Sequence, residues 1–577
     1  MTIIMHKKEK SLLVNKQETY ADFIIRYLSE LQSQFVFGVP GGAIEPFVDA
    51  LARSERDSGI KFIVARHEAG AAFMADGFSR ETGKLGVCCA TTGPGATNLL
   101  TGIACAYADN IPMLVITAQT AIVKFGSGAL QDSSCSAIDI IAIFKHCTRY
   151  SSLVSHTQQL ERKLKTAIIT AFTEPKGPVH LSIPSDILNE VTHKVPLQKV
   201  KSLTSPRWMY DHYAYGLLCI KLSSAKRIAF FIGQGAQGCG NVIMQLAHKL
   251  QAPVICGMMG KAWVDETDPL FYGVYGFAGH QKAKDLIEEQ DFEVLIAIGT
   301  QLEELGTNGG DSQLLSHKLI HIDQNSEHFS RSTMACLHLH GHIPCILDAL
   351  LNESQILTKE PLEKISNKSL LFDLPAVSKV NNVLHPAVLF YFLSQNLPFK
   401  TRTFIDAGNA WAWASHYFLH SDNNGCFRIA TGFGAMAWAI GAAVGSACTV
   451  IDALTICITG DGSYLMSAQE ITVAQQQKLP LIIIVLNDSA LGMVKHGQQL
   501  GGAEQIGYQL PHINFAAMAQ AMNINNIVIK NQIELSAINW LKLSKLEGPT
   551  LIDIHIDPNA VPPMGDRVQG LATSERV

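Results

Sequence analysis

Two acidic residues in the last quarter of the sequence each follow a strand-like segment. Asp461 lies in a Gly-Asp-Gly turn after the apolar segment 454–459, and Asp488 follows the apolar run 481–486 and one asparagine. The pattern predicts strand, turn, helix and strand, so both carboxylates should lie at the carboxyl edge of a parallel sheet, where such sheets bind ligands. Two carboxylates suit Mg²⁺, which completes its coordination with phosphate and water oxygens. The helix that begins after the turn favours a bound diphosphate.

Three blocks of alternating apolar strands and amphipathic helices make up most of the chain. They span residues 19–191, 208–353 and 381–557, with polar linkers between them, a flexible extension at 1–18 and a tail at 558–577. Alternating strands and helices are typical of parallel sheets that carry helices on both faces. We therefore predict an α/β fold of three Rossmann-like, doubly wound parallel-sheet domains.

The composition excludes several classes of function. Of the 577 residues 47% are apolar and 16% charged, and the net charge of −5 comes without any basic block, so we expect large cores and no nucleic-acid partner. No apolar stretch reaches bilayer length without a glycine or a polar break, so we expect no membrane partner. The 13 cysteines are scattered and the N-terminus lacks a secretory signal pattern, which favours a cytoplasmic protein.

Several glycine-rich motifs give the whole chain a specific resemblance. It resembles the acetolactate synthase branch of the thiamine-diphosphate enzymes, which have a pyrimidine-binding domain, a central domain and a diphosphate-binding domain. In this family a second metal ligand, usually Asn, follows the Gly-Asp-Gly aspartate by about 27 residues, and here that spacing falls on Asp488. The motifs that carry the resemblance lie at residues 37–43, 66–77, 92–98, 406–409 and 432–436.

The resemblance implies a catalytic role for Glu68, which follows the apolar segment 62–65. In the family this glutamate hydrogen-bonds the pyrimidine ring of thiamine and promotes the imino tautomer that removes the C2 proton. The alternative is a solvated glutamate at a helix N-terminus, stabilised by the helix dipole.

The resemblance also implies roles for the other site residues. Met436 would hold the cofactor bent, although core filling is the alternative for a methionine, and Gln131 would face the substrate unless it lies in a surface loop. Ala490 would give a backbone carbonyl to the Mg²⁺ held by Asp461 and Asp488, and Met493 would lie near the substrate. The remaining cofactor contacts would come from Gly408, Asn409, Gly434, Gly462 and Ser463.

Two positions depart from the family pattern near the substrate. Ser185 stands where acetolactate synthases place a lysine, and Gly497 stands where the biosynthetic enzymes have a tryptophan that restricts the acceptor pocket. Loss of an indole opens volume and removes a stacking surface. We therefore expect an acceptor different from, or bulkier than, those of the biosynthetic enzymes.

The central block departs from the family at its FAD motif. The segment 299–305 lacks the family's arginines and carries Glu303 and Glu304, which would repel a diphosphate, so we expect no tightly bound FAD. A G-x-G-x-x-G run at 233–238 follows an apolar strand, but the next strand ends in Gly-Met rather than in the acidic residue of a dinucleotide site. We interpret this run as a vestige of nucleotide-site topology.

The leading hypothesis is therefore a thiamine-diphosphate-dependent and Mg²⁺-dependent carboligase. It would decarboxylate a 2-oxo acid, with pyruvate expected, and add the enamine to a second carbonyl, as in acetolactate synthesis. The alternatives are an enzyme that forms a different acyloin, a 2-oxo acid decarboxylase, an FAD-dependent oxidase, an NAD-dependent dehydrogenase and a catalytically silent regulatory homologue. The resemblance implies a homodimer or homotetramer with the active site between chains.

Overall fold

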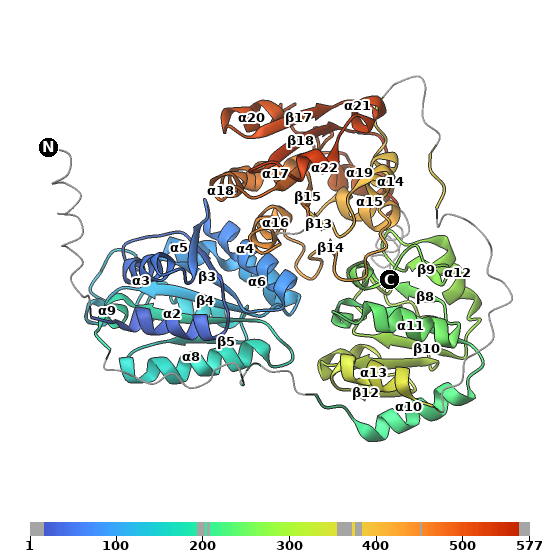
Figure 1. Cartoon of the computed structure of the whole chain (residues 1–577), viewed down its shortest axis with the longest axis horizontal. Helices are drawn as coiled ribbons and strands as arrows, with labels where there is room; N and C mark the ends of the chain where they lie inside the picture. Colours follow the sequence, from blue (N-terminus) through green and yellow to red (C-terminus); the bar gives the residue numbers. More distant parts are fainter. Residues whose placement is uncertain are drawn as a thin grey trace. The chain divides into compact units, whose positions relative to one another are not determined.

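The computed structural model describes residues 17–192, 202, 204, 208–354, 372–375, 383–450 and 453–564. The chain divides into two compact units, Met1–Ser205 and Pro206–Val577. The first unit holds one sheet and the second holds two (Figure 1). Most of the expected N-terminal extension, most of both linkers and the tail from residue 565 lie outside the described residues.

The sheet of the first unit has six parallel strands in the order β2-β1-β3-β4-β6-β5. Every residue of β3, β4 and β6 is buried, as expected for central strands covered on both faces. In Figure 1 the sheet lies between helices α2 (Tyr20–Glu30) and α8 (Thr157–Phe172) and helices α4 (Glu68–Thr82) and α6 (Leu100–Ala108). The strands are β1 (Phe35–Gly38), β2 (Lys61–Val64), β3 (Gly86–Ala90), β4 (Met113–Gln119), β5 (Tyr150–Leu153) and β6 (Pro178–Pro184).

The central sheet, in the second unit, has the order β12-β11-β10-β7-β8-β9 and is also parallel throughout. Counted along the chain, this is the 3-2-1-4-5-6 order of the classical dinucleotide-binding sheet. The strands are β7 (Ile228–Ile232), β8 (Val254–Cys256), β9 (Phe271–Val274), β10 (Val294–Ile298), β11 (Leu319–Asp323) and β12 (Leu337–His340).

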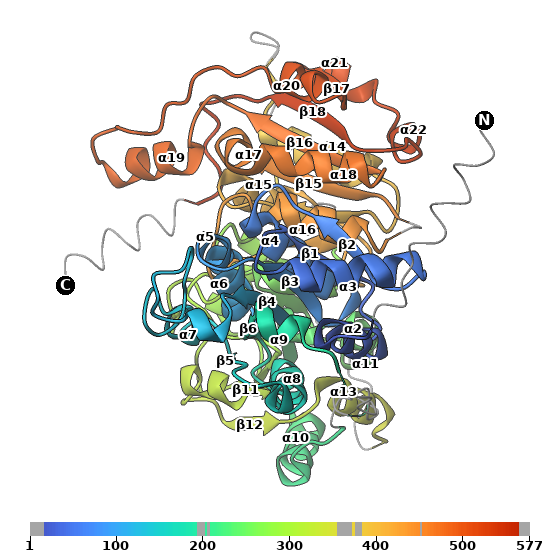
Figure 2. The ribbon, with the colours of Figure 1, turned by 90° about the vertical axis from the view of Figure 1, so that its left-hand side faces the viewer.

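The third sheet, in the same unit, has the order β14-β13-β15-β16-β18-β17, which repeats the topology of the first sheet. Helices α14 (Pro386–Asn396) and α15 (Asn409–Tyr417) share an apolar core with one face of this sheet, and α16 (Trp438–Ala447) packs on β13 and β15. Figure 2 shows α19 (Gly492–Gly501) to one side of the third sheet. The strands are β13 (Arg402–Ile405), β14 (Phe427–Arg428), β15 (Thr455–Gly460), β16 (Leu481–Asn487), β17 (Asn525–Ile529) and β18 (Thr550–His555).

The three parallel sheets confirm the predicted fold class, whereas the domain boundaries stay a prediction. The apolar pattern does not identify the edge strands β5 and β12, because neither has a continuous apolar run. Strand β5, for example, reads Tyr-Ser-Ser-Leu and is half-buried along its whole length. No helix in the described part of the chain is both long and apolar enough to cross a membrane.

Candidate active site

The third sheet brings three motifs to one edge. Its strand order reverses direction between β13 and β15, and such a switch point opens a crevice at the carboxyl ends of the strands. Asn409 begins the helix after β13, Asp461 begins the helix after β15, and Asp488 directly follows β16. Because β13, β15 and β16 are neighbours, residues distant in sequence meet at this crevice.

Asp461 is held by backbone donors at the start of α17 (Asp461–Ser467). Its Oδ1 accepts from the Gly462 N–H at 2.7 Å, and its Oδ2 accepts from the Ala490 N–H at 3.3 Å. The side chain is buried, and burial raises the pKa of Asp461 to about 6. The bond to Ala490 also places that residue, the expected carbonyl ligand of Mg²⁺, beside the carboxylate.

Asp488 rather than Asn487 faces the crevice. Asn487 ends β16 and is buried, and its Nδ2 donates to Asp553 Oδ1 at 2.9 Å. Burial, and then the negative charge of Asp461, raise the pKa of Asp488 to about 7. Two partly buried carboxylates that repel one another are stabilised by a divalent cation, so the donor set fits Mg²⁺.

Gly492, the first residue of α19, is where Asn409 and Asp488 converge. A Cβ placed on Gly492 would lie 2.5 Å from Asn409 Nδ2 and 2.9 Å from Asp488 Oδ2. Asn409 Nδ2 also lies 3.1 Å from Nδ1 of His496, while its Oδ1 is buried without a hydrogen-bond partner among the described residues. An unsatisfied polar atom at this point fits a bound polar ligand.

The turn before α16 carries Gly434 and Met436. Gly434 has a φ of +71°, which favours glycine. Met436 packs against the apolar core, and a Cβ on Gly462 would lie 3.7 Å from Met436 Cε. The methionine therefore lies next to the Gly-Asp-Gly turn, so core packing and the expected contact with the cofactor are compatible.

Asp406 holds this turn in place, a role that sequence reasoning missed although it noted the motif. The carboxylate is fully buried and accepts from Thr459 Oγ1 at 2.8 Å and from the N–H groups of Ala407 and Ala437 at 3.0 Å each. Ala437 has a φ of +68°, a conformation that costs energy for alanine and that this bond supports. Burial raises the pKa of Asp406 to about 6.

The other cofactor and substrate candidates of this unit lie around the same crevice. Gly408 precedes α15 with a φ of +120°, and Ser463 is buried in the first turn of α17 with its Oγ 3.5 Å from the Ala407 carbonyl oxygen. Met493 lies in the first turn of α19, half-buried against the core.

Glu68 lies at the carboxyl edge of the first sheet, in the other unit. It is the first residue of α4, and His67 caps that helix by accepting from the Ala69 N–H. Glu68 Oε2 accepts from Asn98 Nδ2 at 3.0 Å, and a Cβ on Gly95 would lie 3.2 Å from Oε1. The glutamate is thus oriented by a side chain from the neighbouring glycine-rich turn, a partner that sequence reasoning did not identify.

Gln131 lies beside the turn that follows β3. It is exposed, has a φ of +59°, and its Cβ would lie 2.9 Å from a Cβ placed on Gly93. Thr92 Oγ1 lies 2.9 Å from the Gln131 carbonyl oxygen and 3.0 Å from Ser133 Oγ. This loop therefore brings Gln131 to the same turn that leads into Asn98.

Comparisons with known proteins identify the three domains of the chain and its relatives. Models of the N-terminal TPP binding, central and C-terminal TPP binding domains of thiamine pyrophosphate enzymes match residues 18–140, 218–350 and 406–554. The large subunit of acetolactate synthase isozyme 2 from Escherichia coli K12 is 30% identical, covering 93% of this chain and 95% of that protein. A probable acetolactate synthase large subunit from Methanococcus aeolicus is 29% identical, covering 94% and 93%.

A solved structure shows the same fold. The thiamine diphosphate-dependent 4-hydroxybenzoylformate decarboxylase of Rhodococcus jostii RHA1 superposes with a TM-score of 0.78 over 94% of this chain and 100% of that chain, at 20% identity.

Substituting Gly492 should weaken cofactor binding. We expect Gly492→Ala to bind thiamine diphosphate with Mg²⁺ about 10–100-fold more weakly, because the new methyl group displaces both Asn409 and Asp488. Gly497→Ala is the matched control on the same helix, since a Cβ there meets nothing within 4 Å. Titration calorimetry measures both, and equal affinities in the two variants would refute the convergence at Gly492.

Binding of Mg²⁺ with thiamine diphosphate should release protons, and the binding affinity should therefore decrease as the pH is lowered. Because the pKa values of Asp461 and Asp488 are raised to about 6 and about 7, both carboxyls take up protons below neutral pH and lose the charge that a cation needs. We expect affinity to fall between about pH 8 and about pH 6, measured by calorimetry in buffers of different ionisation heat. Asp488→Asn should show a shallower dependence, while the ligand's own titration is common to both proteins. A wild-type dependence no steeper than that of Asp488→Asn would contradict the assignment.

Proposed function

The chain belongs to the acetolactate synthase family of thiamine pyrophosphate-dependent enzymes, and we propose that it decarboxylates pyruvate or a similar 2-oxo acid and joins the product to a second carbonyl compound. The observation that carries the proposal is the paired, partly buried carboxylates Asp461 and Asp488 at the switch point of the third sheet. A carboligase of this kind needs an anchored diphosphate, and that crevice provides oxygen ligands for the accompanying Mg²⁺.

Different residues at this crevice would bind the metal ion, the diphosphate and the pyrimidine ring. Asp461, Asp488 and the Ala490 carbonyl would hold Mg²⁺, and Gly408, Asn409, Gly462 and Ser463 would contact the diphosphate. Gly434 and Met436 would support the pyrimidine ring, in a turn that Asp406 fixes. Bound thiamine diphosphate supplies a stabiliser for the carbanion that forms when a 2-oxo acid loses carbon dioxide.

Glu68 would exchange a proton with the pyrimidine ring nitrogen. Asn98 holds Oε2 by a 3.0 Å hydrogen bond, which leaves Oε1 as the free oxygen. The missing side chain at Gly95 leaves space beside Oε1, since a Cβ there would press to within 3.2 Å of it. A carboxyl group with one oxygen fixed and the other accessible is suited to proton exchange with a bound ring.

We also propose that two copies of the chain form the smallest active unit. The candidate residues fall into one set with Glu68 and Gln131 and another with Asp461 and Asp488, each at the carboxyl edge of its own sheet. Large apolar side chains lie exposed beside the second set, with Phe433 next to Gly434, and Leu465 and Met466 on α17. A second copy covering these side chains would remove them from water and complete the site.

The acceptor is proposed to differ from that of the biosynthetic enzymes. A Cβ on Gly497 meets nothing within 4 Å, so this position of α19 borders open space. Ser185, at the start of α9 (Ser185–Asn189), leaves out the positive charge of the family lysine. Both features favour a bulky acceptor that does not depend on contact with a positively charged side chain at position 185.

The main competing functions make different products. A simple 2-oxo acid decarboxylase would release an aldehyde, and the fold neighbour of Rhodococcus jostii bears the name of a decarboxylase. An enzyme that makes another acyloin would need a particular aldehyde or 2-oxo acid as acceptor. A silent homologue would bind cofactor and turn over no donor, although Glu68, Met436, Asp461 and Asp488 are all present.

Product analysis separates these functions. Purified protein with pyruvate, Mg²⁺ and thiamine diphosphate should form acetolactate or, with one acceptor of an aldehyde and 2-oxo acid panel, a mixed acyloin detected by mass spectrometry. Glu68→Gln should lower the rate by about 100-fold or more because the proton exchange is lost. Glu55→Gln on the exposed face of α3 (Glu45–Arg56) is the control and should keep full activity. Release of acetaldehyde alone, or no turnover, would overturn the carboligase proposal.

Introducing the family's tryptophan at position 497 should narrow the range of acceptors that the enzyme uses. We expect Gly497→Trp to lower kcat/KM for acceptors bulkier than pyruvate by about tenfold or more, because the indole fills the open space at α19. Competition between two acceptors, read by product ratio, measures the change. An unchanged ratio in a well-folded variant would place the acceptor elsewhere.

A further inference from the structure

The central sheet has the topology of a dinucleotide site. Its strand order reverses between β7 and β10, and the G-x-G-x-x-G run 233–238 follows β7 directly. In such sheets a pyrophosphate lies over this turn, at the N-terminus of the next helix, which here is α11 (Gly240–Leu250). The family's FAD and the alternative of NAD would both need space at this point.

The loops after β7 and β10 contact each other and fill this crevice. The Gly235 N–H donates to the Gly299 carbonyl oxygen at 2.7 Å, which joins the loops after β7 and β10. A Cβ on Gly233 would lie 2.4 Å from that oxygen, and a Cβ on Gly299 would lie 2.5 Å from the Gly235 carbonyl carbon. The two loops are therefore in backbone contact, with no room for a phosphate between them.

The helix N-terminus is covered as well. Asn423, from the segment between α15 and β14, packs against Gly240 so closely that a Cβ there would lie 2.3 Å from the Asn423 carbonyl oxygen. The short helix η5 (Met258–Trp263) covers the end of β7, because a Cβ on Gly260 would lie 2.0 Å from the Ile232 carbonyl oxygen. Both parts of the expected pyrophosphate site are thus filled by protein.

The loop after β10 continues across the neighbouring strand ends. A Cβ on Gly257, which follows β8, would lie 4.0 Å from Glu303 Oε1. The Leu305 carbonyl then accepts from the Phe277 N–H at 2.8 Å, beyond the end of β9. A ligand extending along this edge would meet the loop and the carboxylate of Glu303 rather than open space.

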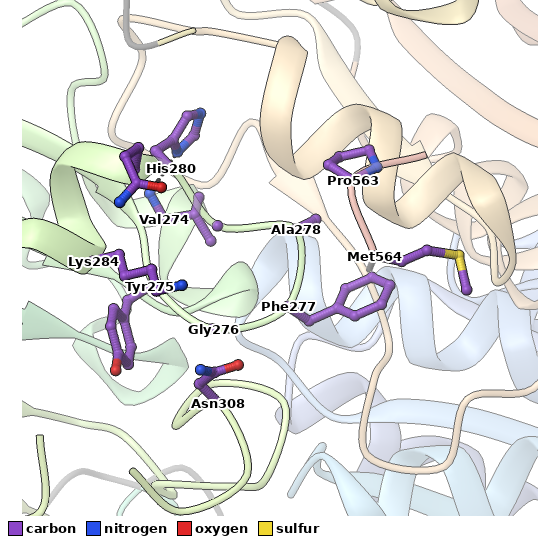
Figure 3. A pocket seen from close by; sticks show the side chains of 12 residues that line it. Val274, Tyr275, Gly276, Phe277, Ala278, His280, Lys284, Asn308, Pro563 and Met564 are labelled. Atoms are coloured by element: carbon purple, nitrogen blue, oxygen red, sulfur yellow. Dashed lines mark hydrogen bonds between the residues drawn. The ribbon is translucent and has the colours of Figure 1, made fainter. Parts of the chain in front are cut away.

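A cavity of about 190 Å³ lies beyond the edge strand β9 (Figure 3), and none of its lining residues belongs to the 233–238 run. It lies between the loop 274–281, which carries Tyr275 and Phe277, and Met564 of the C-terminal segment, with Lys284 and Asn308 also at its wall. Pockets for drug-sized ligands measure about 300–1,000 Å³, so this one is too small for a dinucleotide.

We propose that the central domain binds no dinucleotide, because the loop after β10, helix η5 and Asn423 occupy the place of one. The residues present do not fit FAD or NAD, and the glycines of the 233–238 run allow close packing of the chain on itself instead of close approach of a phosphate. This inference is independent of the carboligase proposal, since it concerns a different sheet. It argues against the FAD-dependent oxidase and the NAD-dependent dehydrogenase.

Nucleotide content and thermal shift test the proposal. Protein purified without added cofactor and then denatured should release flavin, nicotinamide and adenine nucleotides at far below one per chain, by fluorescence and mass spectrometry. Added FAD, NAD⁺ or ADP should leave the melting temperature unchanged, whereas thiamine diphosphate with Mg²⁺ should raise it. Release of one nucleotide per chain, or a melting temperature raised by FAD, NAD⁺ or ADP, would overturn the proposal.

A matched pair of variants tests the packing directly. Gly235→Ala should lower the melting temperature of the nucleotide-free protein by several degrees, because its methyl group would lie 2.9 Å from Gly299 Cα. Gly216→Ala on α10 (His212–Ser224) is the control, since a Cβ there meets nothing within 4 Å. If Gly235→Ala melts like this control, the two loops have space between them and the proposal fails.

Discussion

The buried carboxylate of Asp406 is the interaction on which the candidate site depends. Through Thr459 and Ala437 it joins the ends of β13 and β15 to the turn that carries Met436. Buried donors and acceptors must be paired, so moving one of these segments would leave a carboxylate unsatisfied inside the protein. Asp461 and Asp488, by contrast, lie close enough at the crevice for the negative charge of Asp461 to raise the pKa of Asp488. Repulsion between neighbouring carboxylates, rather than the number of hydrogen bonds, therefore distinguishes the two that suit a cation from the one that holds the turn.

Three parallel sheets of similar size differ in the segments that follow their strands. The first and third sheets share one strand order, and both carry neighbouring polar side chains at their carboxyl edge, such as Glu68 with Asn98 and Asp461 with Asp488. The central sheet has the dinucleotide order, yet its glycine-rich turn packs against Gly299. Topology fixes where a ligand could lie, and the loops decide whether space remains for it.

The parts of the site that follow from local pattern could be predicted from the sequence. Asp461 and Asp488 each come one residue after an apolar run, and the parallel arrangement of those runs brings the two together. The spacing already favoured Asp488 over Asn487, and the structure adds a physical reason, the hydrogen bond from Asn487 to Asp553 on the neighbouring strand β18. The roles of Asn98 and Gly492 were missed, since they rest on contacts with distant residues that no spacing rule encodes.

In the proposed site, helix α19 would combine anchoring of the cofactor with open space on the side of the acceptor. Gly492 and His496 lie one turn apart, so both face Asn409. The short distance to Asn409 leaves no room for a larger side chain at Gly492. Gly497 is turned about 140° from Gly492 around the helix axis and borders open space. If the proposed acceptor site is correct, substitutions at Gly497 would reshape it without moving Asn409 or Asp488. A family that keeps one cofactor and varies its acceptors would be expected to vary this side of the helix and to preserve the other.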